Sequence, residues 1–212
     1  MQRTAIIILA AGGSRRLGQP KQLLYIMGEP LLRRIVRIAA DTHPDHLIVV
    51  LGSSAYDCVP VIKHCGADIV VNPFWESGLA GSIRLGVERA EEEGADSILL
   101  LLADQPWLNA EVIHQFLDRM KGEPDMIVAA SYEGVLGAPM MFGSAWFVRL
   151  KTLEGDQGAR NIVAREGNRV QVVEWSDGAV DVDTPEDLAG LMRGVESMRH
   201  ASSSGRQSEV PD

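Results

Sequence analysis

Glycines and basic side chains lie close together near the start of the chain, in the sequence ILAAGGSRRLGQPK. Gly12 and Gly13 let backbone N–H groups approach an anion without a Cβ in the way. An arginine can hold phosphate oxygens through two donors, and a lysine adds a mobile positive charge, so Arg15, Arg16 and Lys21 suit a polyphosphate. The glycine spacing is that of neither a P-loop nor a dinucleotide-binding loop. The alternative is an ordinary βα loop whose basic residues are only solvated.

A carboxylate follows the most apolar run of the chain, where LLLLADQPWL places Asp104 after the leucines. Ligands of open parallel sheets bind at the carboxyl ends of the strands, so Asp104 would share an edge with the glycine–arginine loop. A carboxylate repels phosphates unless a divalent cation lies between them, and proteins hold Mg²⁺ through one or two carboxylates plus phosphate oxygens. We favour Mg²⁺ over the alternative, in which Asp104 caps a helix that starts after Pro106.

The stretch DVDTPEDL supplies a second candidate metal ligand. Thr184, Pro185 and Asp187 are typical of a helix start, with a hydroxyl N-cap, proline at the first position and an acid at the third. Capping leaves Asp183 unexplained, and it is the natural second carboxylate for the same Mg²⁺. Asp181 is a weaker candidate, because alternation along an extended chain places it on the same face but further back.

The pattern of apolar residues predicts a scaffold that brings these loops to one edge. Aliphatic runs recur at residues 6–11, 46–52, 68–72, 97–103, 126–131 and 169–175. Between the first four runs, segments 30–42 and 78–94 carry apolar residues at helical spacing. The alternation of strands and helices predicts a three-layer α/β/α sandwich with a mostly parallel, Rossmann-like sheet. The sequence YEGVLGAPMMFG reads as a turn between short extended pieces.

Length and composition indicate one acidic domain. The 212 residues, 46% of them hydrophobic, can bury a full core, and we place the folded domain at residues 1–196. The polar, serine-rich stretch 197–212 is expected to be disordered. A net charge of −9 argues against nucleic acid as a partner, so the basic cluster indicates a local anionic ligand. The first apolar stretch is too short for a membrane span, and it runs straight into the glycine loop, so a signal peptide is not expected. Cys58 and Cys65 lack metal-site spacing, and we expect packed thiols in a reducing cytoplasm.

Several motifs together resemble one enzyme family. LAAGGSRRLGQPK resembles the LAAGxSxRxGxxK signature of the MobA-like nucleotidyltransferases. Further blocks, similar to those of the branch that contains molybdenum cofactor cytidylyltransferase, follow in order over residues 5–191, namely NPFWESGLAGSIRLG, DQPWL, GAPMMF, GDQGAR and DVDTPEDL. The resemblance implies the nucleotide-diphospho-sugar transferase type of the three-layer fold. It also implies Mg²⁺-dependent transfer of CMP from CTP to the phosphate of a molybdopterin-type cofactor, with release of pyrophosphate.

The resemblance assigns roles to matching positions. Residues expected to contact the nucleotide are Leu9, Ala10, Ala11, Gly12, Gly13, Arg16 and Lys21. The stretch from Asn72 through Gly78 to Ser82 would help to recognise the base or to position the acceptor. Arg16 and Lys21 would bind the β- and γ-phosphates and act in catalysis together with Asp104, and Asp104 and Asp183 would hold Mg²⁺. Gly78 and Ser82 open a predicted helix, whose free N–H groups and small hydroxyl suit the amide-like edge of a base.

Three other positions receive roles from the resemblance, and two of them, Arg160 and Trp75, keep two interpretations each. Gly137 would shape the acceptor pocket, and Arg160 either binds an acceptor phosphate or is a solvated helix residue. Trp75 either contributes to the site or anchors a surface turn by packing. Guanylyl-transferring relatives typically read LAGG where this chain reads LAAG, and a methyl group at Ala11 would narrow the base pocket toward a pyrimidine.

Three alternative functions stay open at this stage. They are a guanylyltransferase, an NTP transferase acting on another small phosphate monoester, and a non-catalytic carrier of molybdenum cofactor. A carrier has no need of a metal–triphosphate site, which argues against it. A molybdenum hydroxylase apoenzyme is the expected protein partner, and neither nucleic acid nor a membrane is expected to bind.

Overall fold

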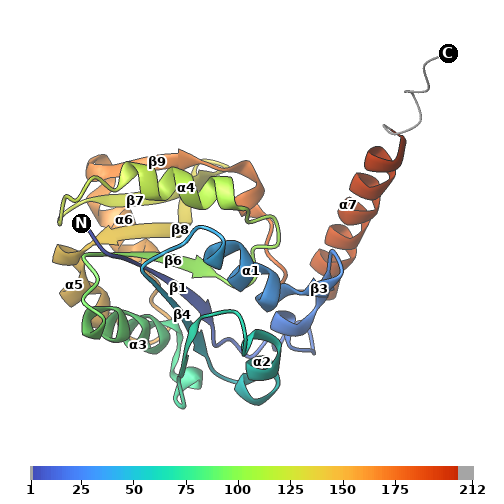
Figure 1. The fold of residues 1–212 in the computed structure, drawn as a ribbon, viewed down its shortest axis with the longest axis horizontal. Helices are drawn as coiled ribbons and strands as arrows, with labels where there is room; N and C mark the ends of the chain where they lie inside the picture. The colour runs from blue at the N-terminus through green and yellow to red at the C-terminus, as the bar shows by residue number, and fades with distance from the viewer. Residues whose placement is uncertain (1, 205–212) are drawn as a thin grey trace.

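The computed structural model describes residues 2–204, and its centre is a seven-stranded sheet in the order β5-β4-β1-β6-β8-β7-β9 (Figure 1). The strands are β1 (Thr4–Ala10), β4 (His46–Leu51), β5 (Asp68–Val71), β6 (Ser97–Leu102), β7 (Ile127–Tyr132), β8 (Val135–Gly143) and β9 (Val170–Glu174). All pairings are parallel except the two that β8 makes. Each predicted aliphatic run is therefore a strand, and the mostly parallel sheet is confirmed.

Helices cover both faces of the sheet. They are α1 (Leu31–Ala40), α2 (Ala55–Ile62), α3 (Leu79–Glu92), α4 (Ala110–Arg119), α5 (Phe147–Lys151) and α6 (Arg160–Glu166), whereas α7 (Pro185–Ser204) packs through Leu191 and Val195 and extends away from the sheet (Figure 1). A small hairpin of β2 (Tyr25–Ile26) and β3 (Glu29–Pro30) precedes α1. One buried cluster contains residues of α1, α2 and α4, and a second contains residues of α3, α5 and α6. The predicted three-layer α/β/α sandwich is confirmed.

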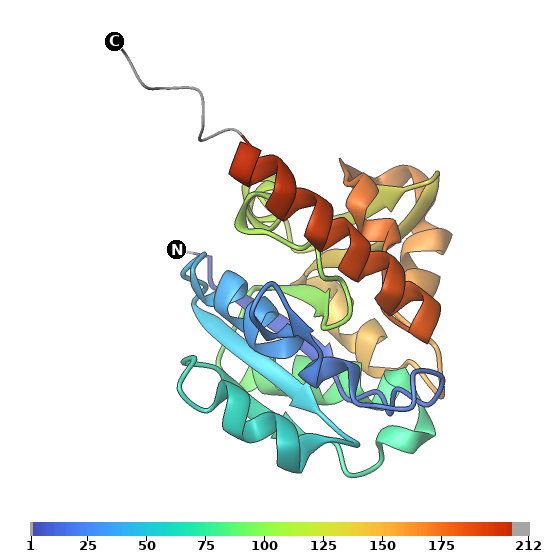
Figure 2. The same cartoon turned by 90° about the vertical axis from the view of Figure 1, so that its right-hand side faces the viewer.

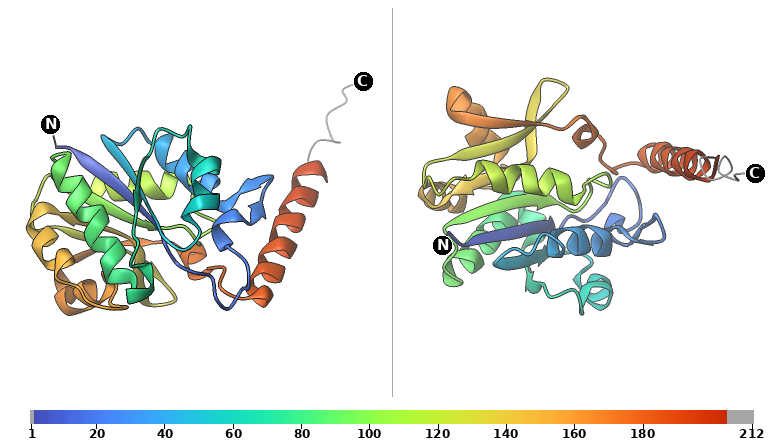
Figure 3. Two further views of the ribbon diagram at one scale, coloured as in Figure 1. Left: turned by 90° about the horizontal axis from the view of Figure 1, so that it is seen from below. Right: turned by 45° about the horizontal axis from the view of Figure 1, so that its top comes forward.

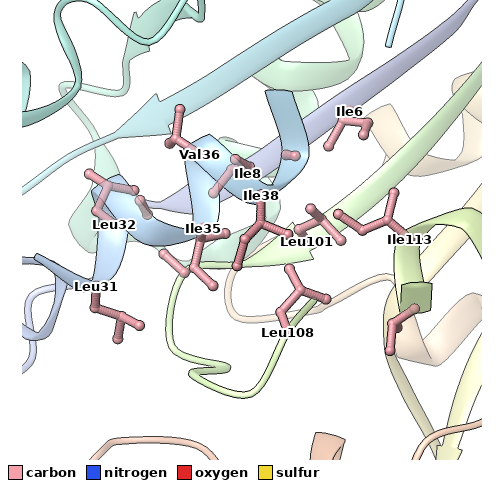
Figure 4. Packing of buried hydrophobic residues seen from close by; sticks show 14 of the residues in the cluster. Ile6, Ile8, Leu31, Leu32, Ile35, Val36, Ile38, Leu101, Leu108 and Ile113 are labelled. Atoms are coloured by element: carbon pink, nitrogen blue, oxygen red, sulfur yellow. The ribbon is translucent and has the colours of Figure 1, made fainter. Parts of the chain in front are cut away.

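The side chains of β1 show why both faces need a cover. Ile6 and Ile8 belong to the first cluster, whereas Ile7 belongs to the second, because successive side chains of a strand point to opposite faces. All three are fully buried. Figure 4 shows Ile6 and Ile8 beside residues of α1 such as Ile35, together with Leu101 of the neighbouring β6. A continuous apolar run therefore marks a central strand of this sheet.

The segment after β7 differs from the turn between short pieces that its composition suggested. Glu133 and Gly134, both with positive φ, form a tight turn, and β8 runs antiparallel from there over nine residues. Side chains that look irregular in the sequence thus lie in a buried central strand.

Helix α7 is longer than the sequence predicted. It runs to Ser204, beyond the boundary placed at residue 196, and the expected disorder of the tail stays a prediction. Leu191 and Val195 anchor the helix in the first cluster, and Figures 1 and 3 show α7 extending away from the sheet. The rest of the expected disordered tail, 205–212, lies outside the described residues.

Within residues 2–204, no helix has the length and apolar character needed to cross a bilayer.

The two cysteines are expected to differ in reactivity. Cys58 is buried in α2, and this burial, together with the charge of Asp57, raises the pKa of its thiol to about 11. Cys65 is only partly buried. At pH 8, iodoacetamide should therefore alkylate Cys58 much more slowly than Cys65, as followed by mass spectrometry of the two peptides. Because the folded state favours the neutral thiol, the stability that Cys58 contributes is complete below pH 9 and is lost as the pH rises through about 11. Equal alkylation rates at pH 8 would contradict this assignment.

Candidate active site

The glycine–arginine loop and Asp104 meet because their strands are neighbours. β1 and β6 pair in parallel with Leu9 opposite Leu102, and the N–H of Ala103 donates to the carbonyl of Leu9 at 3.2 Å. The segments that follow β1 and β6 therefore leave the sheet at the same edge. A cavity of about 390 Å³ opens there, within the range of ligand sites. Its lining includes Leu9, Ala10, Ala11, Gly12, Gly13, Lys21, Gly78, Ser82 and Asp104.

A buried glutamine holds the loop in shape. The side-chain amide of Gln22, 1% exposed, donates to the carbonyls of Ala10 and Gly12, both at 2.9 Å. The hydroxyl of Ser14 accepts from the N–H of Lys21 at 3.0 Å, which closes the loop around its basic residues. No motif in the sequence pointed to Gln22, because its partners are main-chain carbonyls that leave no pattern of residue types.

Four charged side chains from three distant segments meet beside the glycine loop. Lys21 Nζ donates to Asp104 Oδ2 at 2.6 Å and to Asp183 Oδ1 at 2.8 Å, and Arg16 also donates to Asp183. Burial alone would lower the pKa of Lys21, but the charges and hydrogen bonds of Asp104 and Asp183 outweigh it and raise that pKa. Lys21 therefore keeps its positive charge. The structure thus brings together Arg16, Lys21, Asp104 and Asp183, four residues that the resemblance assigns to one site.

Helix α7 presents Asp183 to this cluster. Asp187 N–H donates to Thr184 Oγ1 at 3.2 Å, and the Asp187 carboxylate accepts from the N–H groups of Thr184 and Asp183 at 2.8 and 3.1 Å. This is the predicted capping box, and it leaves the Asp183 side chain available for Lys21. Figure 2 shows the start of α7 beside the loop that follows β1. Loss of hydration raises the pKa of neighbouring Asp181, and the nearby charges of Asp104 and Asp183 raise it further.

Asp104 and Asp183 have the carboxylate oxygens that a divalent cation prefers. α4 begins at Ala110 and is capped by Asn109, whose side chain accepts from the N–H of Val112 at 2.9 Å, so the helix-cap interpretation of Asp104 is wrong. Asp104 Oδ1 is buried and has no hydrogen-bond partner. Among the described residues no group of three or more Asp, Glu, His or Cys side chains could hold a metal ion. Two carboxylates suffice for Mg²⁺ when phosphate oxygens complete its shell.

The residues expected near the base divide into lining and supporting groups. Gly78 and Ser82 line the cavity, whereas Asn72 lines a neighbouring groove. Asn72 is buried, donates from Nδ2 to Ser82 Oγ at 3.0 Å and accepts from the N–H of Phe74 at 2.9 Å. Asn72 therefore orients Ser82 and the turn before α3 instead of facing the cavity itself.

Trp75 both packs and lines the cavity. A Cβ on Gly13 would lie 2.8 Å from the Trp75 ring, so the indole covers the glycine loop at van der Waals distance. The guanidinium of Arg15 lies 5.8 Å from the ring centroid and pairs with Glu76 at 3.6 Å. The anchor and site interpretations of Trp75 are thus compatible.

Gly137 and Arg160 do not line the cavity. Gly137 lies in β8 against Tyr132, whose hydroxyl would be 2.0 Å from a Cβ at that position. Burial raises the pKa of Tyr132, and the positive charge of Arg160 at the start of α6 opposes this effect, so the two side chains lie near each other. The structure therefore groups Gly137, Arg160 and Tyr132 apart from the nucleotide loop, and sequence reasoning missed Tyr132.

A second buried glutamine links this region to Asp104. Gln105 is 3% exposed, and its amide donates to the carbonyls of Ala138 at 2.9 Å and Gly178 at 3.2 Å. The first carbonyl belongs to β8 and the second to the segment that leads to Asp183. Gln105 thus ties both segments to the loop that carries Asp104, and the sequence offered no signal for these contacts.

Gly78 should be irreplaceable for stability. Its φ is +110°, and a Cβ would lie 2.3 Å from the backbone of Gly155. Gly78→Ala should therefore destabilise the fold by at least about 2 kcal/mol, or roughly 4–8 °C in thermal unfolding. Gly12→Ala is the matched control, because no heavy atom lies within 4 Å of its added methyl group. That variant should keep its unfolding temperature, and equal unfolding temperatures for both variants would contradict the argument.

A three-layer fold with a glycine loop, basic residues and two carboxylates at one strand edge defines a nucleotide-binding transferase. Residues 6–170 match the MobA-like NTP transferase domain, and the chain belongs to this family of NTP transferases. The fold is of the nucleotide-diphospho-sugar transferase type, as predicted.

Relatives of known name span nearly the whole chain. The chain is 32% identical to the purine catabolism protein PucB of Bacillus subtilis, over 89% of this chain and 96% of that protein. It is 28% identical to a protein of Nostoc sp. named "Probable molybdenum cofactor guanylyltransferase", over 89% and 90% of the two chains. The crystal structure of Rv0371c of Mycobacterium tuberculosis in complex with manganese superimposes with a TM-score of 0.75 at 28% identity, over 91% and 99%.

Proposed function

We propose that this protein transfers CMP from CTP to the phosphate of a molybdopterin-type cofactor and releases pyrophosphate. An oxygen of the acceptor phosphate would attack the α-phosphorus of CTP, and the bond from that phosphorus to the bridging oxygen of the pyrophosphate would break. The observation that carries the proposal is the meeting of Arg16, Lys21, Asp104 and Asp183 beside the glycine loop, where Lys21 lines both the main cavity and a smaller one next to it.

The chain's own residues would act by positioning and by charge. The loop backbone from Leu9 to Gly13 would surround the nucleotide, and Arg16 and Lys21 would neutralise the charge that grows on the leaving pyrophosphate. Asp104 and Asp183 would hold Mg²⁺, which when bound neutralises the phosphate oxygens. Nothing in this scheme needs a covalent enzyme intermediate.

Support for CTP comes from the loop sequence. Ala11 lines the cavity and is 7% exposed, so its methyl group would take space beside a base bound there. This favours a pyrimidine over the larger guanine. GTP is the second candidate, because the relative in Nostoc is named as a guanylyltransferase.

The acceptor is proposed from the names of relatives and from the family resemblance. The Nostoc relative is named for molybdenum cofactor. Gly137, Arg160 and Tyr132 lie together on the β7–β8 side of Asp104, which makes that side the proposed place for the acceptor. Delivery of the product to a molybdenum hydroxylase stays a prediction of the resemblance. A carrier without catalysis is disfavoured, because it would have no use for the charged cluster.

A thermal-shift series tests the nucleotide. Ligands that bind only the folded state raise its stability, by about 2.7 kcal/mol at 100 times Kd. With Mg²⁺ present, CTP should raise the unfolding temperature more than GTP, ATP or UTP, and EDTA should abolish the difference. A larger shift with GTP would support the guanylyltransferase instead, and the absence of any shift would contradict a nucleotide site.

A further inference from the structure

Lys21 lies between Asp104 and Asp183, the two carboxylates proposed as metal ligands. Its ammonium group donates to one carboxylate oxygen of Asp104 and to one of Asp183, at 2.6 and 2.8 Å. Both Lys21 and Asp104 are largely buried, with side chains 15% and 17% exposed. A single cation thus joins the two carboxylates from segments that are far apart in the sequence.

Charge balance explains why a cation must be there. Two carboxylates at this depth repel each other unless a positive charge lies between them. Lys21 supplies that charge, and Arg16 adds a second at Asp183. In this arrangement the cluster is neutral without any metal, and an added divalent cation would meet the Lys21 ammonium at short range.

The protein alone also offers too few ligands for a tightly bound metal. Mg²⁺ prefers an octahedral shell and is bound through one or two carboxylates plus substrate phosphates. Within residues 2–204 no cluster of three or more Asp, Glu, His or Cys residues could provide more. The missing ligands would come with a triphosphate, which would also offer Lys21 a new anionic partner.

Lys21 has room to change partners. Its side chain lines the main cavity together with Asp104, and it also lines a smaller cavity of about 190 Å³ with Arg16 and Asp183. Its backbone stays fixed through the N–H bond to Ser14, so only the flexible side chain needs to move.

We propose that Lys21 is the resident cation of the Asp104–Asp183 pair, and that a divalent cation binds there only together with the triphosphate that draws Lys21 away. The proposal rests on the proposed function only in requiring a triphosphate ligand. It makes metal binding ordered: the free protein has low affinity for the ion, and the nucleotide supplies both extra ligands and a new partner for Lys21.

Binding of Mn²⁺ alone, followed by the electron paramagnetic resonance signal of the free ion, tests this order. Without nucleotide, Lys21→Met should bind Mn²⁺ at least about tenfold more tightly than the natural protein, because the competing charge is gone. Lys21→Arg keeps the charge and should bind as weakly as the natural protein. With a CTP analogue that carries a methylene group between the α- and β-phosphates, the natural protein should bind Mn²⁺ tightly.

Two controls make the result specific. Lys151 does not line the cavity, and its Nζ lies 2.5 Å from Glu91 Oε2. Lys151→Met should therefore leave the affinity for Mn²⁺ unchanged. The double variant Lys21→Met/Asp104→Asn should lose the gain, which places the ion on Asp104. Equal Mn²⁺ affinity of the natural protein and Lys21→Met without nucleotide would overturn the proposal. This result is independent of transfer: a failed CMP-transfer assay with the gain intact would remove only the proposed function.

Discussion

Lys21→Ala should lower the rate of nucleotidyl transfer by about 10²–10³-fold, the usual loss when one charged donor to the transition state is removed. The leaving pyrophosphate gains negative charge as its bond to the α-phosphorus breaks, and Lys21 is the most buried basic side chain at the cavity. Initial rates of pyrophosphate release at saturating CTP measure the effect. Circular dichroism should show an intact fold, because Arg16 still pairs with Asp183.

Controls separate a catalytic loss from a general charge effect. Lys151→Ala removes the same charge from a surface pair and should keep the natural rate. Lys21→Arg should recover only part of the activity, because a guanidinium does not reproduce the compact ammonium. A folded Lys21→Ala protein with a near-natural rate would remove Lys21 from the mechanism.

Asp104→Asn should weaken Mg²⁺-dependent nucleotide binding at least about 100-fold. Even residues that only support a metal ligand cost about 10–100-fold in metal affinity when changed, and Asp104 is proposed as a direct ligand. Titration of CTP by isothermal calorimetry, with Mg²⁺ and with EDTA, measures the effect. The substitution keeps the shape of the side chain, so the fold should persist.

Asp181→Asn is the matched control for this prediction. It removes the same charge close to the cluster, since the pKa of Asp181 responds to Asp104 and Asp183. Nucleotide affinity should change little, as Asp181 is not proposed to hold the ion. If Asp104→Asn and Asp181→Asn behave alike, then Asp104 contributes only to the general field of the site and is not a metal ligand.

The sequence predicted the parts of this architecture that follow from the spacing of apolar residues and from the order of strands and helices along the chain. Unbroken aliphatic runs such as the one containing Ile7 can be buried on both faces only in a central strand. Parallel strands place their carboxyl ends at one edge, which brings Lys21 and Asp104 together although 83 residues separate them. The helix start at Thr184 was readable because capping depends on local residue types.

The remaining features depend on contacts that residue types do not encode. Gln22 and Gln105 bind main-chain carbonyls, and any segment can offer such an acceptor. The antiparallel direction of β8 depends on the tight turn after Tyr132. The direct pairing of Lys21 with both carboxylates, instead of with phosphate alone, appears only in three dimensions.

The most direct test of the account is transfer itself. CTP carrying radioactive phosphorus at the α-position is incubated with the protein, Mg²⁺ and purified molybdenum cofactor under exclusion of oxygen, with parallel reactions that contain labelled GTP. The account predicts that the label moves from CTP to the cofactor, that one pyrophosphate is released per transfer, and that GTP reacts far more slowly. Label that stays in CTP, or moves to the cofactor only from GTP, would contradict it.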